Sequence, residues 1–346
     1  MRVARFYGPG DIRLEDAPKP EPGPGELLLR VHACGTCGTD AKIFAFGHPR
    51  LVPPRVIGHE VAGVVEELGA GTEGFAVGDR VQLIAAIPCG ECFECTHRSM
   101  SICANQESIG YDYDGGFAGW LVVPAKVLRV SGLNRVPGSL SFEEAAVTEP
   151  LACVLNGQEL ARVSTDDVVV VIGAGPIGCF HVRLARARGA SQIALVDVNG
   201  ERLEMSASRV EPDLAVDASK ENAIDAVLKL TDGRGADVVI TAAASRQAQE
   251  EALQMAARAG RISFFGGLQK DDPFVTLDSN LIHYRELTIV GANGSSPAQN
   301  AEALRLIATG AVPVADLITD RLPLEEVHRA IEAVRSGKSI KVVITP

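Results

Sequence analysis

The chain has 346 residues, which exceeds one ordinary hydrophobic core and predicts two domains. Its formal net charge of −11 argues against nucleic acid or an anionic membrane as a partner. No apolar run reaches the ~18 residues of a transmembrane helix. Residues 1–16 lack the apolar core of a signal peptide, so we expect a cytoplasmic protein that acts on a small molecule.

The first part of the chain, residues 1–150, is predicted to form a β-rich domain. Turn-rich segments with proline, glycine or serine separate four short β-branched runs. These runs cover residues 26–34, 59–69, 78–86 and 119–130. Over residues 142–161 apolar residues recur at helical spacing instead, which sets the expected end of the domain near residue 150.

A stretch with two cysteines and two histidines joins the first two runs. Residues 34–60 read CGTCGTDAKIFAFGHPRLVPPRVIGHE. Thiol and imidazole groups suit zinc, so Cys37 and His59, with the carboxylate of Glu60 beside them, are candidates for half of a metal site. A free cysteine is, however, usually a small buried hydrophobic residue. From these residues alone both interpretations stay open.

Four of the eight cysteines lie close together, which does not fit the disulfide framework of a short secreted domain. Their spacing is C-x2-C-x2-C-x7-C, formed by Cys89, Cys92, Cys95 and Cys103. Four thiolates at this spacing can close a tetrahedral shell around a structural zinc, in a lobe over about residues 88–104. An iron–sulfur cluster also uses four cysteines, but its short-spaced signature needs proline where this chain has Ala104.

Strand and helix patterns alternate through the second predicted domain, residues 151–291. Helix-like segments, such as residues 176–189 and 245–260, fall between most of six near-continuous apolar runs. Such runs predict an α/β fold with a doubly wound parallel sheet covered on both faces. The runs cover residues 168–173, 192–198, 214–218, 236–242, 261–267 and 286–292.

The first of these runs leads into a dinucleotide-binding pattern. The pattern is G-x-G-x-x-G at the start of a helix, formed by Gly173, Gly175 and Gly178. The first glycine permits a tight turn, the second lets the backbone approach a pyrophosphate, and the third lets helix and strand pack closely. Asp197 ends the next run, where its carboxylate can bind ribose hydroxyls and repel a 2′-phosphate, or can simply be solvated. We therefore expect NAD rather than NADP. Further candidate cofactor contacts are Pro176, Ile177, Arg202, Gly266, Ala292 and Asn293.

The alternation of strands and helices stops after residue 292. Residues 300–310 and 324–337 are predicted amphipathic helices, and residues 341–346 are a predicted last strand. We expect this final segment, residues 292–346, to return to the first domain.

Jointly these segments resemble the zinc-dependent medium-chain dehydrogenases, in the branch of sorbitol (polyol) and threonine dehydrogenases. CGTCGTD, GHEVAGVVEELG, GDRV, the four-cysteine lobe, GGFAGWLVVP, TEPLAC and GAGPIG occur in family order along essentially the whole chain. The resemblance implies a GroES-like catalytic domain with a Rossmann NAD-binding domain, a catalytic and a structural zinc per subunit, and a homotetramer or homodimer. The implied activity is oxidation of a secondary alcohol, a polyol or cyclitol, to a ketone, with hydride transfer to NAD.

The resemblance also implies roles for residues near the metal. It makes Cys37 and His59 ligands of the catalytic zinc, and Glu60 a ligand or a close exchange partner for water. Glu149 stands where polyol dehydrogenases have a glutamate that binds the metal directly or through water. A helix-start acid is the alternative for Glu149. Asp40 is expected to order the local backbone.

Thr39 resembles the hydroxyl that passes the substrate proton toward solvent. Many relatives have histidine three residues later, where this chain has Lys42. Lys42 could relay protons or bind an acidic group of the substrate; the alternative is a lysine that is exposed or contacts the ribose. Lys42, Arg50 and Arg55 would also suit the anionic substrate of a sugar-phosphate dehydrogenase. Amino-alcohol and aminocyclitol dehydrogenases are further alternatives, and an NAD-binding regulatory protein of the same fold is the non-enzyme alternative.

Overall fold

A computed structural model describes residues 1–346. The chain divides into two units, one formed by Met1–Ala152 with Gly294–Pro346 and the other by Cys153–Asn293. The first unit is therefore built from both ends of the sequence. None of the helices is long and apolar enough to cross a membrane.

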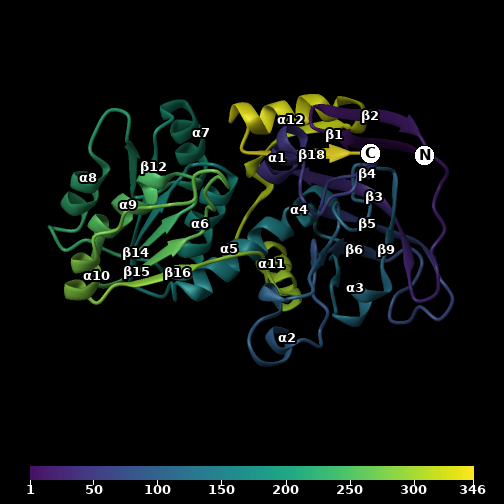
Figure 1. Ribbon diagram of the computed structural model, residues 1–346, viewed down its shortest axis with the longest axis horizontal. Coiled ribbons are helices and arrows are strands. Elements are labelled where there is room, and N and C mark those ends of the chain that lie inside the picture. Colours follow the sequence, from purple (N-terminus) through teal and green to yellow (C-terminus); the bar gives the residue numbers. More distant parts are fainter. The chain divides into compact units, whose positions relative to one another are not determined.

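A seven-stranded sheet forms the centre of the first unit. Its strands are β3 (Leu27–Thr36), β5 (Glu60–Leu68), β6 (Arg80–Leu83), β9 (Trp120–Val123), β10 (Leu133–Arg135), β17 (Ile318–Pro323) and β18 (Lys341–Thr345). The order is β10-β6-β5-β3-β18-β17, with β9 also paired to β3, and only β17 and β18 run parallel to each other. Val342 lies opposite Thr36, so the last strand reaches the segment just before Cys37 (Figure 1).

Smaller elements surround this sheet. The short strands are β1 (Arg2–Gly8), β2 (Asp11–Asp16), β4 (Arg55–Val56), β7 (Ala86–Ile87) and β8 (Glu107–Ser108). The helices are α1 (Gly38–Phe46), α2 (Phe93–His97), α3 (Ala125–Arg129), α4 (Phe142–Ala146), α5 (Thr148–Leu160, which runs into the second unit), α11 (Pro297–Ala308) and α12 (Val327–Ser336). Three single-turn 3₁₀ helices cover Met100–Ile102, Ala315–Leu317 and Leu324–Glu326.

Proline explains two differences from the predicted elements. The expected strand over residues 119–130 ends at Val123, and α3 follows, because Pro124 has no N–H for a strand ladder and caps the helix instead. The expected helix over residues 142–161 is split at Val147 into α4 and α5. Pro150 cannot donate the hydrogen bond that would join the two helices.

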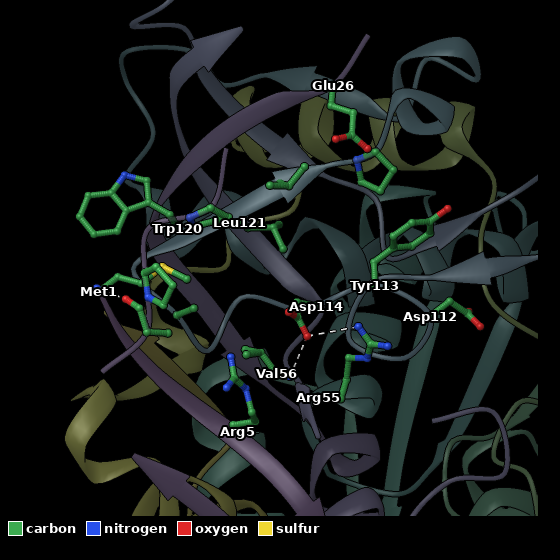
Figure 2. Close-up of a pocket in the computed structure, with 17 residues that line it drawn as sticks. Met1, Arg5, Glu26, Arg55, Val56, Asp112, Tyr113, Asp114, Trp120 and Leu121 are labelled. Atoms are coloured by element: carbon green, nitrogen blue, oxygen red, sulfur yellow. Dashed lines mark hydrogen bonds and ion pairs between the residues drawn. The ribbon is translucent and has the colours of Figure 1, made fainter. Parts of the chain in front are cut away.

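The first unit also contains a cavity of about 310 Å³ beside its N-terminal strands (Figure 2). Arg5 and Arg55 line it, but each has a carboxylate partner, Glu15 at 3.2 Å and Asp114 at 3.3 Å respectively. None of the predicted metal ligands or cofactor contacts lines this cavity. We therefore assign it no part in the chemistry.

The second unit holds the predicted six-stranded parallel sheet. Its strands are β11 (Val168–Ile172), β12 (Gln192–Asp197), β13 (Leu214–Asp217), β14 (Ala236–Thr241), β15 (Ala256–Phe264) and β16 (Thr288–Gly291). Its other helices are α6 (Pro176–Ala187), α7 (Gly200–Val210), α8 (Ala223–Leu230), α9 (Arg246–Met255) and α10 (Ser279–Arg285). The strand order is β13-β12-β11-β14-β15-β16. The chain moves from β11 toward one edge of the sheet and from β14 toward the other. Because the crossover connections are right-handed, their helices cover both faces of the sheet, which confirms the doubly wound fold (Figure 1).

One helix boundary in this unit differs from the prediction. The helix expected over residues 245–260 ends at Met255, and β15 already begins at Ala256. Ala256 pairs with Ala236 of β14 before a shift in register, and the side chains of Ala256 and Ala257 are buried. Tertiary pairing therefore overrides the helix propensity of these alanines.

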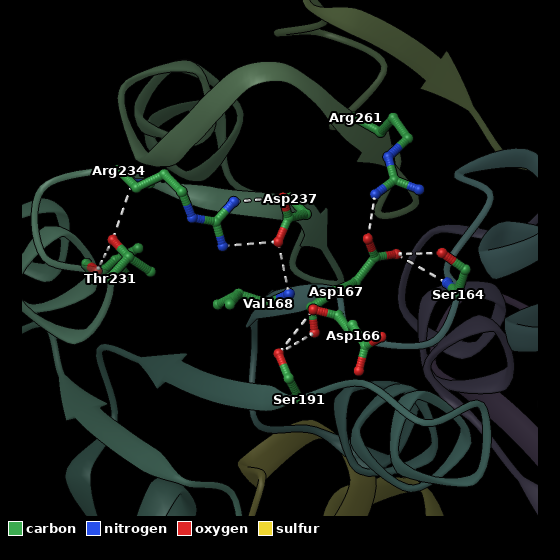
Figure 3. Close-up of polar contacts among 11 residues, drawn as sticks. Ser164, Asp166, Asp167, Val168, Ser191, Thr231, Arg234, Asp237 and Arg261 are labelled. Carbon is green, nitrogen blue, oxygen red and sulfur yellow. Dashed lines mark hydrogen bonds and ion pairs between the residues drawn. The ribbon is translucent and has the colours of Figure 1, made fainter.

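Carboxylates fix the edge of this sheet at which the strands begin (Figure 3). Asp167, just before β11, accepts a hydrogen bond from Arg261 at 2.6 Å. Asp237 in β14 accepts one from the Val168 amide at 2.8 Å and one from Arg234 at 2.9 Å. The opposite edge, where parallel strands end, is the edge at which such folds bind ligands.

Candidate functional site

The four cysteines of the lobe surround one point. Their sulfur atoms all lie within 4.8 Å of one another, with Cys89–Cys103 at 3.5 Å, Cys92–Cys103 at 3.8 Å and Cys89–Cys95 at 4.0 Å. Zn–S bonds of about 2.3 Å in a tetrahedron separate the sulfurs by about 3.8 Å, so the four thiols fit a zinc ion. They also fill its shell and leave no position for a substrate.

Backbone amides donate hydrogen bonds to two of the four sulfurs of the lobe. The Cys92 amide donates to the Cys89 sulfur at 3.3 Å, and the Cys89 amide donates to the Cys103 sulfur at 3.2 Å. Backbone hydrogen bonds from Glu91 and Cys92 lower the pKa of the Cys89 thiol to about 6. The deprotonated form is the one that binds a metal.

Cys37 is held at the start of α1 by a capping box. It is the N-cap residue, and its sulfur accepts a hydrogen bond from the Thr39 amide at 3.2 Å. Asp40 returns its carboxylate to the Cys37 amide at 2.9 Å. The helix start therefore fixes the direction of the thiol.

His59 faces Cys37 across a gap that suits a metal. His59 Nε2 lies 3.4 Å from the Cys37 sulfur, and tetrahedral zinc would separate such ligands by about 3.5 Å. His59 Nδ1 lies 3.6 Å from Asp40, whose carboxylate is fully buried and favours the tautomer with Nε2 free for a metal. Burial alone would lower the pKa of His59, but Cys37 and Asp40 together raise it well above its usual range. The pocket thus favours a positive charge.

Glu60 forms a buried ion pair that the sequence analysis missed. Lys341 is 1% exposed, and its Nζ lies 2.5 Å from Glu60 Oε1, contacts Oε2, and donates to the Thr36 carbonyl at 3.3 Å. A Cβ at Gly35 would lie 1.8 Å from Glu60 Oε2, so glycine makes room for the carboxylate. No local pattern reveals Lys341, because it begins a short strand whose next three residues are buried and apolar.

Glu149 joins the same region from the first turn of α5. A carboxylate oxygen of Glu149 and the ligand atoms of His59 and Glu60 lie within 4.8 Å of one another. A second group within this limit consists of Cys37, Asp40 and His59. The structure therefore brings all predicted catalytic-metal ligands into two groups that share His59.

The other predicted residues near the metal differ in their surroundings. Thr39 is half-buried and its hydroxyl has no hydrogen bond within the chain, whereas Lys42 is exposed on α1. Arg50 pairs with Asp112 and reaches the Ser108 hydroxyl at 3.4 Å. Since Arg55 also has a carboxylate partner, neither arginine is left unpaired for an anionic substrate.

Tyr111 is a further residue at this site that the sequence analysis missed. Its ring centre lies 6.1 Å from that of His59, at 21°, and 4.7 Å from that of His48, at 37°. Burial raises the pKa of its hydroxyl, and the nearby charges of Cys37 and Glu149 raise it further. The only sequence signal for Tyr111 was an aromatic residue in a glycine-flanked turn.

The glycine loop of the second unit borders a cavity of about 360 Å³, lined among others by the predicted contacts Gly173, Gly175, Asp197 and Arg202. Gly173 has φ +116°, which favours glycine. A Cβ at Gly178 would lie 1.8 Å from the Gly173 carbonyl oxygen, so glycine permits close packing of α6 on β11. Pro176, Ile177, Gly178, Gly266, Ala292 and Asn293 do not line this cavity, although they lie at or after the same ends of the strands.

Asp197 has a second role that the sequence did not indicate. One carboxylate oxygen accepts the Ala174 amide of the glycine loop at 2.7 Å, and the other accepts the Asn199 amide at 2.8 Å. Asp197 therefore holds the loop in shape as well as lining the cavity. A carboxylate oxygen can accept more than one hydrogen bond, so the same carboxylate has capacity for ribose hydroxyls as well.

Known proteins resemble the chain over its full length. Residues 23–131 match the family described as alcohol dehydrogenase GroES-like domain, and residues 176–309 match that described as zinc-binding dehydrogenase. Sorbitol dehydrogenase of Halalkalibacterium halodurans is 31% identical over 99% of this chain and 98% of its own. L-threonine 3-dehydrogenase of Pyrococcus horikoshii is 34% identical over 99% and 97%. The solved structure of a Sinorhizobium meliloti protein assigned to the zinc-binding dehydrogenases, bound to NADP, has a TM-score of 0.92 and 30% identity and covers 100% of this chain and 99% of its own.

Proposed function

Because the chain belongs to the zinc-binding alcohol dehydrogenases, enzymes that use zinc and NAD(P), we propose that it oxidises a secondary alcohol of a polyol or cyclitol to a ketone. The observation that carries this proposal is the pair of candidate ligand groups that share His59, one with Cys37 and Asp40 and the other with Glu60 and Glu149. With one thiolate and at least one carboxylate, such ligands would make the zinc a chemically harder centre than two thiolates do. A harder centre binds oxygen ligands more readily, which suits a substrate with two neighbouring oxygens.

The residues of the first unit have separate tasks in this proposal. When bound, zinc lowers the pKa of the alcohol hydroxyl and the nicotinamide accepts the hydride. Cys37 and His59 would hold the metal, Glu149 would complete the set directly or through water, and Asp40 would fix the imidazole. Thr39, whose hydroxyl is unpaired, would accept the substrate proton and pass it outward.

The ion pair with Lys341 lets Glu60 lie beside a metal without occupying its last coordination position. The ammonium group of Lys341 neutralises the Glu60 carboxylate within the protein. The carboxylate then has a partner whether or not it contacts the metal. This arrangement supports a role for Glu60 as an exchange partner rather than a permanent ligand.

The direct test is a substrate panel with zinc-loaded enzyme, followed by NADH absorbance. Vicinal diols, polyols and cyclitols should give the highest kcat/KM, ahead of amino alcohols and sugar phosphates. Thr39→Val should lower kcat by about 10²–10⁴-fold, because it removes the proton acceptor. Thr96→Val, in the four-cysteine lobe, is the matched control and should keep turnover. Dominant activity on sugar phosphates would overturn the substrate class.

We also infer a preference for NAD, supported by the carboxylate of Asp197 in the cofactor cavity. Replacing Asp197 would disturb the glycine loop as well, so the neighbouring Val198, which lines the cavity and is 70% exposed, offers a cleaner test. Val198→Arg should raise kcat/KM for NADP relative to NAD by adding a partner for the 2′-phosphate, and Val198→Leu should not. Wild-type turnover that favours NADP would contradict the inference.

A further inference from the structure

Tyr111 places its ring beside His59 of the candidate catalytic ligands and carries an unpaired hydroxyl. Its ring lies against the imidazole of His59, and the imidazole of His48 lies against the same ring at 4.7 Å. The hydroxyl has no hydrogen bond within the chain, and it is not among the polar atoms sealed from solvent. A polar group in this position is available to a ligand that enters the site.

The backbone that carries Tyr111 is fixed relative to His59. Asp112 binds Arg50, and Asp114 accepts a hydrogen bond from the Val56 amide at 3.0 Å. The segment of Tyr111 is therefore tied twice to the loop that leads into His59. A ring that is held in a fixed position can discriminate between substrates, because it does not move freely to fit each of them.

We propose that Tyr111 is a specificity-determining residue, whose hydroxyl forms a hydrogen bond with a second hydroxyl of the substrate. This inference rests on the proposed function and narrows its substrate class to alcohols with a neighbouring hydroxyl. A tyrosine hydroxyl can both donate and accept, so it can bind the second hydroxyl in either sense. A simple alcohol would leave the tyrosine without that partner, and sites built for a substrate hydroxyl discriminate against analogues that lack it.

The test compares butane-2,3-diol with butan-2-ol, using zinc-loaded enzyme and NAD. Tyr111→Phe removes one oxygen and keeps the ring. It should lower kcat/KM for the diol about tenfold and change that for the simple alcohol less than about twofold, since only the diol makes the hydrogen bond. Tyr113→Phe is the matched control, because the Tyr113 hydroxyl donates to Glu107 at 2.6 Å, and it should change neither value.

A binding measurement gives a second readout. Calorimetry of the diol with the enzyme–NADH complex should show a dissociation constant about tenfold higher for Tyr111→Phe, at unchanged zinc content. Equal losses for both alcohols, or no loss for either, would overturn the role of Tyr111 while wild-type turnover of the diol upholds the proposed function. Wild-type enzyme that oxidises neither alcohol would instead overturn the proposed function, and this inference with it.

Discussion

The two candidate zinc-ligand sets of this chain are built in opposite ways. The four-cysteine set comes from one short stretch, residues 89–103, and its own backbone amides support the sulfurs. The other set draws on the start of α1, the start of β5 and the first turn of α5. A closed set of four thiolates can only stabilise, whereas a set with neighbouring carboxylates can leave a position for a substrate.

The two sets also differ in the charges around them. Beside the second set, a fully buried aspartate, Asp40, contacts His59, and a buried lysine, Lys341, contacts Glu60. The four-cysteine lobe has no comparable ion pair. The four-cysteine set therefore depends on local sequence, while the set proposed for the chemistry depends on packing between distant segments. This difference predicts which substitutions damage one set and leave the other intact.

The largest effect is expected at the buried ion pair. Lys341→Met should lower the free energy of unfolding by about 3–5 kcal/mol, because it leaves the Glu60 carboxylate buried without a partner. Denaturant titration measures the loss. Lys338→Met, at an exposed position of the same segment, is the control and should stay within about 0.5 kcal/mol of wild type.

A double variant sharpens this prediction. Lys341→Met combined with Glu60→Gln removes both charges, so it should be more stable than Lys341→Met alone. If the double variant is less stable than the single one, the unpaired carboxylate is not the cause of the loss. Equal stability of the two lysine variants would contradict the ion pair itself.

A smaller loss is expected from Gly35→Ala. The added Cβ would meet Glu60 Oε2 at 1.8 Å, so the carboxylate or the strand must shift, at a cost of about 2 kcal/mol. Gly38→Ala is the matched control three residues later, where a Cβ meets nothing within 4 Å. Thermal unfolding of the two variants separates them, and equal midpoints would show that Gly35 is not needed for space.

The smallest expected effect concerns Asp40 and the affinity for zinc. Asp40→Asn removes the charge behind His59 and should weaken zinc binding at the second set about tenfold, or about 1.4 kcal/mol. Competition with a chelator measures this affinity. The zinc of the four-cysteine lobe should keep its wild-type affinity in the same protein, and Asp16→Asn, an exposed surface acid, should change neither site.

The parallel sheet and the four-cysteine set could be predicted from the sequence because short local patterns specify both. Six apolar runs specify six strands, and four cysteines at fixed spacing need only a short loop to meet. Lys341 and Gly35 could not be predicted, because their importance arises where β18 and β5 pack beside β3. The start of β15 at Ala256 was predicted as helix, since pairing with β14 is invisible to local propensity.

The most direct test of the account is the zinc content and turnover of two cysteine variants, Cys37→Ser and Cys103→Ser, beside wild type. Wild type should hold about two zinc ions per chain. Cys37→Ser should keep the lobe zinc and lose turnover, while Cys103→Ser should lose the lobe zinc and keep turnover at a temperature where it stays folded. Full turnover in Cys37→Ser, or a folded Cys103→Ser without turnover, would contradict the division of the two sets into chemistry and structure.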